Sequence, residues 1–334
     1  MISLVPVLAC LSALAPVWCV IPLSRFAIDM HFENFLQQHN RVYQNLQERE
    51  FRYHIFTKNL QRLHEMHQLQ PHGRFDFTSY MDHTTEEFVM RHAGLRIDRS
   101  NHLCKTVTDS AIPNIKTPPS FDWRDHNVVT PVKDQKKCNS CYAFSATGNI
   151  EGQYALKHKT LIQLSEQQIV DCDKGSNGCH GGYVTSAYSM LMRAGGSKLE
   201  ADYPYLEYNP HPQCSLSPYD NVVKLAGCES FRLSSQEKLK QLLFHRGPLS
   251  IGVKIEVLHL TPKGRIIQDA ACTGEINHAV LLVGYGEENG IPYWIVKNSW
   301  GVTNHEEGYF RLQRGEGLDS CGLMSGFISS AIVA

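Results

Sequence analysis

The chain has 334 residues, of which 42% are hydrophobic and 19% charged, and its net charge is −1. This length suits two domains, or one domain with appended segments, and the composition is that of a folded globular protein. The near-neutral charge, without a long run of lysine or arginine, argues against nucleic acid or an anionic membrane surface as a partner.

The N-terminal segment predicts entry into the secretory pathway. Met1–Pro22 holds no charged side chain and has an apolar core over Leu4–Ala15, which is typical of a signal peptide cleaved after Ala15 or near Cys19. A membrane anchor is the alternative, but the prolines in this stretch disfavour it. Export would place the eleven cysteines of the chain in an oxidising compartment, where disulfides are allowed.

Two helices are predicted next, as an amphipathic hairpin of a small domain. The first carries a partial apolar stripe of Phe26, Phe32, Phe35 and Leu36. The second places six side chains on one face, namely Glu48, Arg52, Phe56, Asn59, Leu63 and His67. Residues 102–119 mix Thr, Ser, Asn and Pro, so we expect an extended linker there.

From Phe121 onward the chain becomes richer in Trp, Tyr, Gly and Cys. Helical patterns are predicted over 141–157, 166–171, 182–193 and 234–245. β-branched and aromatic runs with glycine punctuation predict strands over 249–255, 278–285, 292–298, 308–313 and 327–333. Helices before strands indicate an α+β fold with two lobes and a cleft between them.

Cys141 is the candidate nucleophile around which the other features can be placed. Ser140 is a plausible N-cap, so Cys141 should lie in the first turn of a helix, where the partial positive charge stabilises a thiolate. A thiol also needs a base and a group that orients the base. His278 could be the base and Asn298 its orienting amide, while Gln135 and the backbone N–H of Cys141 could hold a developing oxyanion.

The pair Cys138 and Cys141 allows two other interpretations. A redox dithiol requires a βαβ unit, which the flanking sequence does not provide. A zinc site requires a second close pair, whereas Cys172 and Cys179 are seven residues apart and fall in different predicted turns. We therefore expect no metal site and no cofactor.

The stretch Cys138–Tyr142 resembles the Cys-Gly-Ser-Cys-Trp signature of the papain-like cysteine proteases, whose His and Asn lie well downstream. Three more stretches match family motifs: Phe121-Asp122-Trp123-Arg124, Gly178-Cys179-His180-Gly181-Gly182 and Asn298-Ser299-Trp300-Gly301, the last followed by Glu306-Glu307-Gly308-Tyr309. The face of the second predicted helix resembles the propeptide motif of the family. The resemblance covers nearly the whole chain, and within the family it is closest to the viral cathepsins of baculoviruses.

The resemblance implies a papain-like two-lobed fold, with a helical left lobe and a β-barrel-like right lobe, preceded by a mainly helical inhibitory propeptide. It places a signal peptide at 1–19, the propeptide at 20–114 and the mature peptidase at 115–334. Within the peptidase, the helical lobe would span about 127–226 and the β lobe about 229–320, with the lobes exchanging terminal segments. The implied function is that of a cysteine endopeptidase made as a secreted zymogen.

Carried over residue by residue, the resemblance makes Cys141 and His278 a thiolate–imidazolium pair at rest. Asn298 would orient His278, Trp300 would shield that hydrogen bond, and Gln135 would complete the oxyanion hole. The implied substrate-binding residues are Tyr183, Val184, Gly181, Gly182, Gly252, Ile276, Asn277, Ala279, Trp300 and Gly326. They include an apolar S2 subsite, made roomy by two glycines, that would prefer a bulky hydrophobic P2 residue.

The family pattern also implies three disulfides, Cys138–Cys179, Cys172–Cys214 and Cys272–Cys321. Cys228 would then remain as a buried thiol, and Cys104 falls in the removable propeptide. An interior ion pair between Glu151 and Lys297 is implied as well.

Several residues depart from the family pattern. Asn139 and Lys136 stand in place of glycines, Tyr142 in place of Trp, and Asn304 and His305 in place of a Trp-Gly pair. The S1′ wall would therefore lose an indole ring.

A catalytically weak or inactive papain-fold binding or inhibitor protein is the alternative function, motivated by Asn139 and Asn304. Exopeptidase activity has weak support, since no large inserted segment is visible to occlude the cleft. The expected partners are peptide substrates, the chain's own propeptide and cystatin-like inhibitors, and a monomer is expected. The expected location is lysosomal or extracellular, reached through the host endoplasmic reticulum if the viral resemblance holds.

Overall fold

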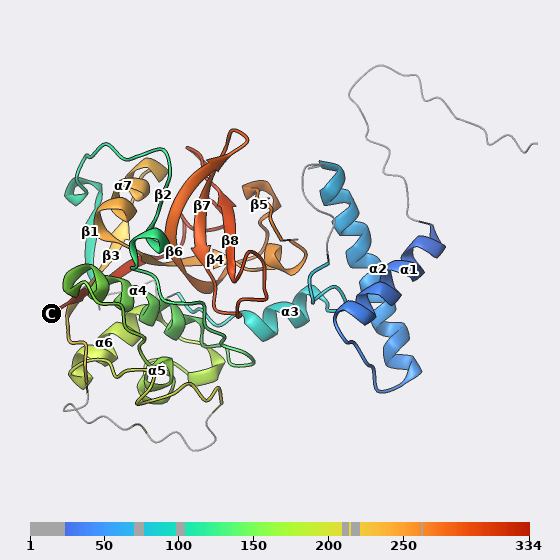
Figure 1. Cartoon of the computed structure of the whole chain (residues 1–334), viewed down its shortest axis with the longest axis horizontal. Helices are drawn as coiled ribbons and strands as arrows, with labels where there is room; N and C mark the ends of the chain where they lie inside the picture. Colours follow the sequence, from blue (N-terminus) through green and yellow to red (C-terminus); the bar gives the residue numbers. More distant parts are fainter. Residues whose placement is uncertain (1–23, 70–76, 98–103, 209–213, 215–220, 262) are drawn as a thin grey trace, which may run out of the picture.

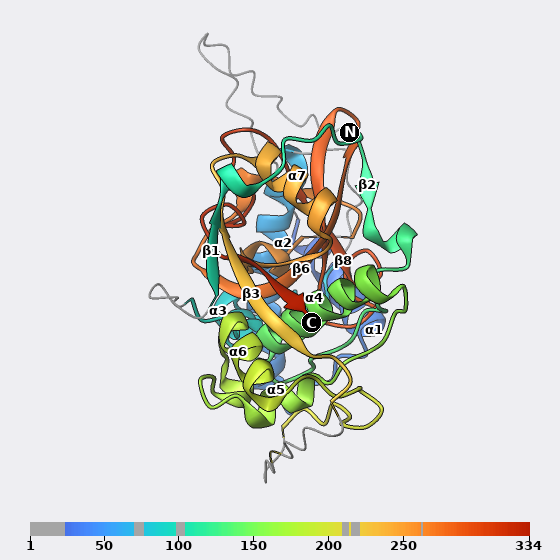
Figure 2. The same ribbon diagram turned by 90° about the vertical axis from the view of Figure 1, so that its left-hand side faces the viewer.

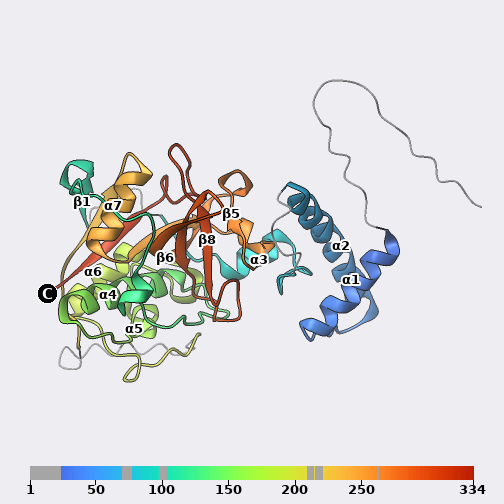
Figure 3. The ribbon, with the colours of Figure 1, turned by 45° about the horizontal axis from the view of Figure 1, so that its top comes forward.

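The computed structural model describes residues 24–69, 77–97, 104–208, 214, 221–261 and 263–334. The expected signal peptide lies outside these residues, as does the side chain of His67. No helix within them combines the length and the apolar character needed to cross a membrane. Figures 1 and 3 show a large body of helices and sheet, with helices α1 and α2 at one end and α3 between them and the body.

Helices α1 (Arg25–Gln38) and α2 (Leu46–Leu69) form the predicted N-terminal hairpin. They enclose an apolar core of their own, made of Phe32, Phe35, Phe56, Leu60, Leu63, Met81 and Leu260. Leu260 comes from the large body and so ties the hairpin to it. Phe26 does not join this core, because its position on α1 is on the opposite face from Phe32 and Phe35, and its side chain is 73% exposed.

Helix α3 (Thr85–His92) was not expected from the patterns above. It begins with a capping box, in which Thr84 and Glu87 each accept a backbone N–H of the other. Phe88 on this helix is wholly buried and joins the apolar core of the sheet lobe. The helix is therefore docked on the body by a core side chain.

Three helices build one lobe of the body, and all agree with the predicted ranges to within two residues: α4 (Cys141–His158), α5 (Glu166–Cys172) and α6 (Val184–Ala194). Ser165 caps α5 by accepting the N–H of Gln168, and Gly195 ends α6 in the left-handed conformation. Helix α4 is buried because α5 and α6 contact it and the sheet packs against it as well.

A mixed sheet builds the second lobe, in the order β1-β3-β9-β4-β6-β7-β8-β5, with β2 paired to β6. The predicted strands are present as β4 (Leu249–Lys254), β6 (Ile276–Glu288), β7 (Ile291–Lys297), β8 (Tyr309–Gln313) and β9 (Ile328–Val333). The long β6 pairs antiparallel with both β4 and β7. Helix α7 (Gln236–Arg246), capped by Ser235, packs against β6.

Four further strands were not predicted: β1 (Lys105–Thr108), β2 (Phe121–Asp122), β3 (Leu225–Arg232) and β5 (Ile266–Ile267). The linker expected over 102–119 is therefore partly wrong, because β1 runs parallel to β3 and extends the sheet. The partner of β1 lies far along the chain, and such non-local pairing leaves little trace in the local composition of a four-residue strand.

Four disulfides join described cysteines. Three are the pairs implied by the resemblance, Cys138–Cys179, Cys172–Cys214 and Cys272–Cys321. The fourth joins Cys104 to Cys228, so the expected free thiol at Cys228 is wrong. The family pattern gave no partner for Cys228, because that partner lies in the segment expected to be removed. Cys141 is the free cysteine of the described residues.

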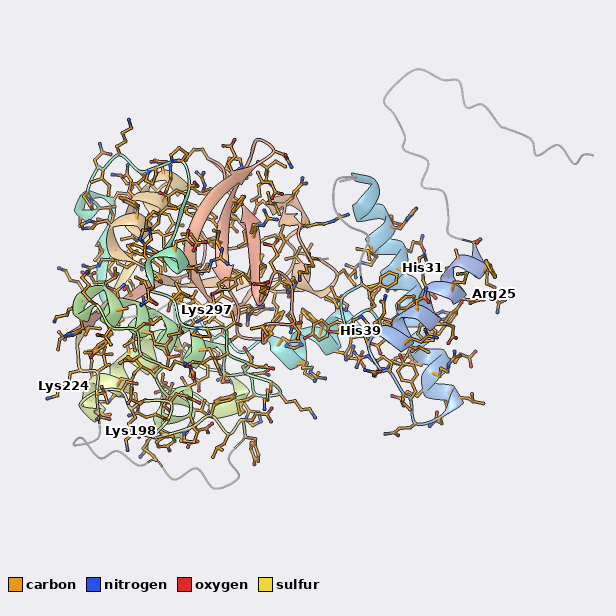
Figure 4. All side chains as sticks on the ribbon, in the orientation of Figure 1. Arg25, His31, His39, Lys198, Lys224 and Lys297 are labelled. Carbon is orange, nitrogen blue, oxygen red and sulfur yellow. A yellow bond between two sulfur atoms is a disulfide. The ribbon has the colours of Figure 1, made fainter. Side chains whose placement is uncertain are left out.

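The expected ion pair between Glu151 and Lys297 is indirect. Glu151 pairs instead with Lys133, whose Nζ lies 3.0 Å from Glu151 Oε1 and 2.7 Å from Glu166 Oε1. Lys297 donates to Thr130 Oγ1 at 2.9 Å, and Thr130 in turn donates to Glu151 at 2.5 Å. Figure 4 labels Lys297 between the helical lobe and the sheet, where burial lowers its pKa to about 8.

Candidate active site

Cys141 is the first residue of α4 and belongs to the apolar core of the helical lobe. Ser140 occupies the N-cap position, but its hydroxyl does not cap the helix and instead contacts the Tyr205 hydroxyl at 2.8 Å. The reason is its backbone, which is not extended as a side-chain cap requires (φ −98°, ψ 19°). The N–H groups of the first turn are therefore not taken up by Ser140.

The Cys141 thiol is wholly buried. Its Sγ accepts the backbone N–H of Ala279 at 3.5 Å, and because Ala279 follows His278, strand β6 brings the imidazole residue to the sulfur on α4. Burial raises the pKa of Cys141 to about 11, and hydrogen bonds from backbone N–H groups, including those of Ala279 and Gly94, offset only part of this rise. A neutral thiol is favoured in this covered site.

His278 is held by Asn298 from the neighbouring strand end. The ring Nε2 lies 2.8 Å from Asn298 Oδ1, which also accepts the N–H of Ser299 at 2.8 Å. An amide oxygen only accepts, so we assign the proton to Nε2 and the lone pair to Nδ1, which has no hydrogen-bond partner of good geometry among the described residues. Burial lowers the pKa of His278 to about 4. The thiolate–imidazolium pair expected at rest is therefore disfavoured while the site is covered.

Trp300 packs on His278, with ring centroids 5.0 Å apart. The indole also contacts two residues of α3, with centroid distances of 4.6 Å to His92 and 5.7 Å to Phe88. The residue expected to shield the His278 hydrogen bond therefore lies over the imidazole, and α3 covers it in turn.

Gln135 is buried and fixed on both ends of its amide. Its Oε1 accepts the Ser299 hydroxyl at 2.6 Å, while its Nε2 donates to the carbonyl of Cys138 at 3.0 Å. Since an amide nitrogen carries two hydrogens, one donor remains for another acceptor. The amide nitrogen thus lies against the turn that leads into Cys141, as an oxyanion donor requires.

The segment after α3 runs through the site. The N–H groups of Gly94 and Leu95 both donate to the carbonyl of Asn277, at 3.1 and 3.0 Å, and Gly94 accepts the N–H of Gly182 at 2.8 Å. An added Cβ at Gly94 would lie 2.1 Å from the carbonyl oxygen of Asn139. Only glycine fits this close approach, so the chain passes directly over the turn that precedes Cys141.

Leu95 fills the position expected for the S2 subsite. Its side chain is buried in the cluster that contains Val184, Ala279, Ile276 and Phe327, and an added Cβ at Gly252 would lie 3.0 Å from Leu95 Cδ2. The lack of a side chain at Gly252 thus leaves space that the Leu95 side chain fills.

Three other residues expected to bind substrate contribute to backbone packing or to a helix end, and do not leave open space in a pocket. An added Cβ at Gly326 would lie 2.6 Å from the carbonyl oxygen of Gly322, so that glycine serves close backbone packing rather than space. Gly181 lies against the backbone of Gly94, since its added Cβ would be 2.7 Å from the Gly94 oxygen. Tyr183 occupies the N-cap position of α6.

The departures from the family pattern have visible consequences. Asn139 is not at positive φ, and its Nδ2 donates to the carbonyl of Met90 on α3 at 3.0 Å. Lys136 does lie in the left-handed region, at φ 53°. Asn304 donates to the carbonyl of Trp300, and the ring of His305 lies 6.3 Å from that indole, so this pair supports the Trp300 loop.

Sequence reasoning missed the residues of the N-terminal segment that occupy the cleft, above all Gly94, Leu95 and His92. One signal was available, since Thr84-Thr85-Glu86-Glu87 has the spacing of a capping box and marks the start of α3.

Two family models match the chain. Residues 117–331 match the papain family cysteine protease model, and residues 32–88 match the cathepsin propeptide inhibitor domain (I29). The first match alone covers more than half of the chain. The papain family model corresponds to the large body, and the propeptide model corresponds to the segment that carries α1–α3.

Similar proteins agree with these matches. A viral cathepsin of Mamestra configurata nucleopolyhedrovirus is 40% identical over 91% of this chain and 89% of its own, and one of Heliothis zea nuclear polyhedrosis virus is 36% identical over 95% and 90%. Among solved structures, digestive procathepsin L2 of Tenebrio molitor has a TM-score of 0.80 at 31% identity, covering 91% of this chain and 99% of the other. The proform of the ragweed pollen protease Amb a 11 has a TM-score of 0.77 at 31% identity, covering 92% and 94%. The chain belongs to the papain family of cysteine proteases, as a zymogen with a cathepsin-type inhibitory propeptide.

Proposed function

We propose that Cys141 is the nucleophile of a cysteine endopeptidase and that His278 is its acid–base partner. The observation that carries this proposal is the meeting of α4 and β6, where the one free described cysteine accepts the N–H of Ala279 beside an imidazole already held by Asn298. The Nδ1 of His278, which does not take part in the hydrogen bond to Asn298, is the nitrogen suited to take the thiol proton.

The reaction follows from these positions. Proton transfer from Cys141 to His278 gives a thiolate, which attacks the peptide carbonyl carbon and forms a C–S bond. The oxyanion accepts hydrogen bonds from the Cys141 N–H and Gln135 Nε2. His278 then gives its proton to the leaving amine, leaving an acyl-enzyme that water hydrolyses with the ring as base. Each of these steps requires that the propeptide first leave the cleft.

We infer a hydrophobic P2 preference from the position of Leu95. A leucine of the propeptide lies among apolar side chains beside Gly252. A P2 leucine or phenylalanine would bury apolar area there, whereas a P2 arginine would bury an unpaired charge.

The proposed processing scheme keeps a signal peptide at 1–19, a propeptide at 20–114 and a mature peptidase at 115–334. The similarity to cathepsins supports a protease of the secretory or lysosomal route that acts on protein substrates. We propose further that it is a monomer and is open to cystatin-like inhibitors. The inactive binding-protein alternative gains nothing from Asn139 or Asn304, since each side chain donates a hydrogen bond to a backbone carbonyl and neither one displaces Cys141, His278 or Gln135.

The test compares wild type with Cys141→Ala after a shift to acid pH. We expect the wild-type zymogen to shorten, to bind a thiol-directed epoxide in a one-to-one ratio at Cys141, and to hydrolyse peptides with leucine or phenylalanine at P2 faster than their arginine counterparts. The Cys141→Ala protein should remain full length and unlabelled. Labelling without hydrolysis, or equal shortening of both proteins, would contradict the proposal.

A further inference from the structure

The Cys104–Cys228 disulfide crosses the boundary between propeptide and peptidase. Cys104 precedes the proposed cleavage near residue 114, while Cys228 lies on β3 in the sheet of the catalytic body. The two Cα atoms are 4.8 Å apart, within the usual range for a disulfide, and the bridge spans 124 residues of sequence. Part of the segment expected to be removed is therefore bonded covalently to the part expected to remain.

The residues after Cys104 are built into the same sheet. Strand β1 pairs in parallel with β3 along its whole length, from Lys105 opposite Glu229 to Thr108 opposite Arg232. On its inner side Val107 is buried in the core of the sheet lobe, and so is Ile112 just beyond the strand. These burials hold the segment independently of the bridge.

Polar contacts fix the end of this segment as well. The Asp109 carboxylate accepts the backbone N–H of Ser234 at 3.1 Å, just before α7. Further on, Asn114 accepts a hydrogen bond from the side-chain amide of Gln241 on α7 at 3.2 Å. The chain from Cys104 to Asn114 is thus attached to the catalytic body by a disulfide, a strand pairing, buried side chains and two hydrogen-bonded contacts.

The anchored segment is remote from the inhibitory contacts. Figure 1 shows β1 at the side of the body opposite to α1 and α2, and Figure 2 shows it lying along β3 at the edge of the sheet. The contacts that cover Cys141 come instead from α3 and from Gly94 and Leu95. Inhibition can therefore end without moving β1. Removal of β1 would make the eight-residue β3 the sheet edge in place of the four-residue β1, and a longer open edge is more prone to unwanted strand pairing.

We propose that the segment from Cys104 to Ile112 stays in the active protease as its edge strand, held by the Cys104–Cys228 bridge, although it lies in the propeptide. Cleavage before Cys104 leaves the segment at the N-terminus of the mature chain. Cleavage after Ile112 leaves a two-chain enzyme whose short chain is disulfide-linked to Cys228. This inference depends on the proposed function only in that activation cuts the chain.

The test is a peptide map of the activated wild-type protein. After acid activation, free thiols are blocked with N-ethylmaleimide, and the mature protein is purified and digested with and without a phosphine reductant. We expect a Cys104–Cys228 cross-linked peptide in the unreduced digest that disappears on reduction, when the bridge takes up two electrons and two protons to give two thiols. Mature protein that lacks Cys104 and carries a maleimide on Cys228 would overturn the proposal.

Two controls make the outcome specific. The Cys104→Ser/Cys228→Ser double variant should give no such peptide, which assigns the signal to this bridge. The Cys141→Ala zymogen, cut by added pepsin at acid pH, should retain the cross-linked peptide even if the wild type fails to process itself. Failure of self-processing would thus count against the proposed protease mechanism, whereas loss of Cys104 from the pepsin-cut protein would count against the retained strand.

Discussion

At the residue scale, the hydrogen bond between His278 and Asn298 determines which ring nitrogen would accept the thiol proton in the proposed mechanism. Because Asn298 Oδ1 accepts a hydrogen bond from the protonated Nε2 of His278, the lone pair of the ring is on Nδ1. Asn298 is itself fixed, since its backbone N–H donates to the carbonyl of Gly308 at 3.0 Å and its Oδ1 accepts the N–H of Ser299. The orientation of the base thus depends on a rigid turn.

We predict that Asn298→Ala lowers kcat/KM by about ten- to a hundredfold. Loss of one buried hydrogen bond costs about 1–3 kcal/mol, and each 1.4 kcal/mol is tenfold. The loss should be mainly in kcat, measured with a leucine-P2 peptide after active-site titration. Thr303→Ala, an exposed change in the following loop, is the matched control and should leave kcat unchanged. Equal kcat in all three proteins would show that Asn298 does not position the ring.

Lys136 offers a residue-scale test of backbone strain. It stands where the family has glycine and lies at φ 53°, a conformation that costs a non-glycine residue about 1 kcal/mol. We therefore expect Lys136→Gly to raise the thermal midpoint of a zymogen kept intact by Cys141→Ala. Lys137→Gly is the control, since Lys137 is equally exposed but is not among the positive-φ residues, and it should lower the midpoint. A fall for Lys136→Gly would refute the strain argument.

At the scale of elements, two buried histidines at the contact between α3 and the body make the docking of the propeptide depend on pH. His92 is buried between Phe88 and Trp300, and burial lowers its pKa to about 3. On the body, His259 stacks on Phe88 at 4.9 Å, and burial lowers its pKa to about 4. A histidine side chain released into water has a pKa of about 6.5. The docked state therefore has its full stability above about pH 6.5 and loses it as the pH falls toward 3 or 4.

We predict that His92→Phe moves acid activation to lower pH. Phenylalanine keeps an aromatic ring against Trp300 but cannot take up a proton, so one source of acid-driven release is removed. The measurement is the rate of zymogen shortening between pH 3 and 7. His54→Phe, on the exposed side of α2, is the control and should leave the pH profile in place. A profile unshifted in His92→Phe would mean that the carboxylates of the propeptide, not His92, govern release.

The elements also show how far the sequence alone can lead. Helices α4 to α7 could be predicted from helical spacing and from cap and terminating residues, and strands β4 and β6 to β9 from β-branched and aromatic runs with glycine between them. Cys141, His278, Asn298 and Gln135 could be selected by residue type and family motifs. Strand β1 could not, since its stability comes from β3 and Cys228 far along the chain.

The propeptide residues that lie in the cleft could not be predicted from the sequence either. Gly94 and Leu95 carry no motif, and their role appears only when the propeptide is laid on the body. The protonation state of Cys141 also could not be predicted from its local sequence. A helix N-terminus favours a thiolate, but burial outweighs that effect at Cys141.

At the scale of the whole molecule, the propeptide inhibits in two ways at once. It blocks the cleft, since Leu95 occupies the apolar subsite and Gly94 passes over the turn at Asn139. In this covered state, burial also raises the pKa of Cys141 to about 11 and lowers the pKa of His278 to about 4, which favours the neutral forms of both. The second effect predicts a property that a simple steric plug would not have.

We predict that Cys141 in the zymogen reacts with a small alkylating agent at pH 7 at least about a hundred times more slowly than a free thiol. A pKa raised from 9.0 to about 11 cuts the thiolate fraction by about a hundredfold, and complete burial slows access further. Iodoacetamide, smaller than any peptide substrate, makes the measurement, with the modified residue identified by mass. Leu95→Asp should speed the reaction, because a buried carboxylate would loosen the propeptide over the site. Ile97→Asp, two residues on but exposed, should not. Fast labelling of the wild-type zymogen would mean that the propeptide excludes substrates but leaves Cys141 as a thiolate. Activation would then require only that the propeptide be displaced, with no later proton transfer from Cys141 to His278.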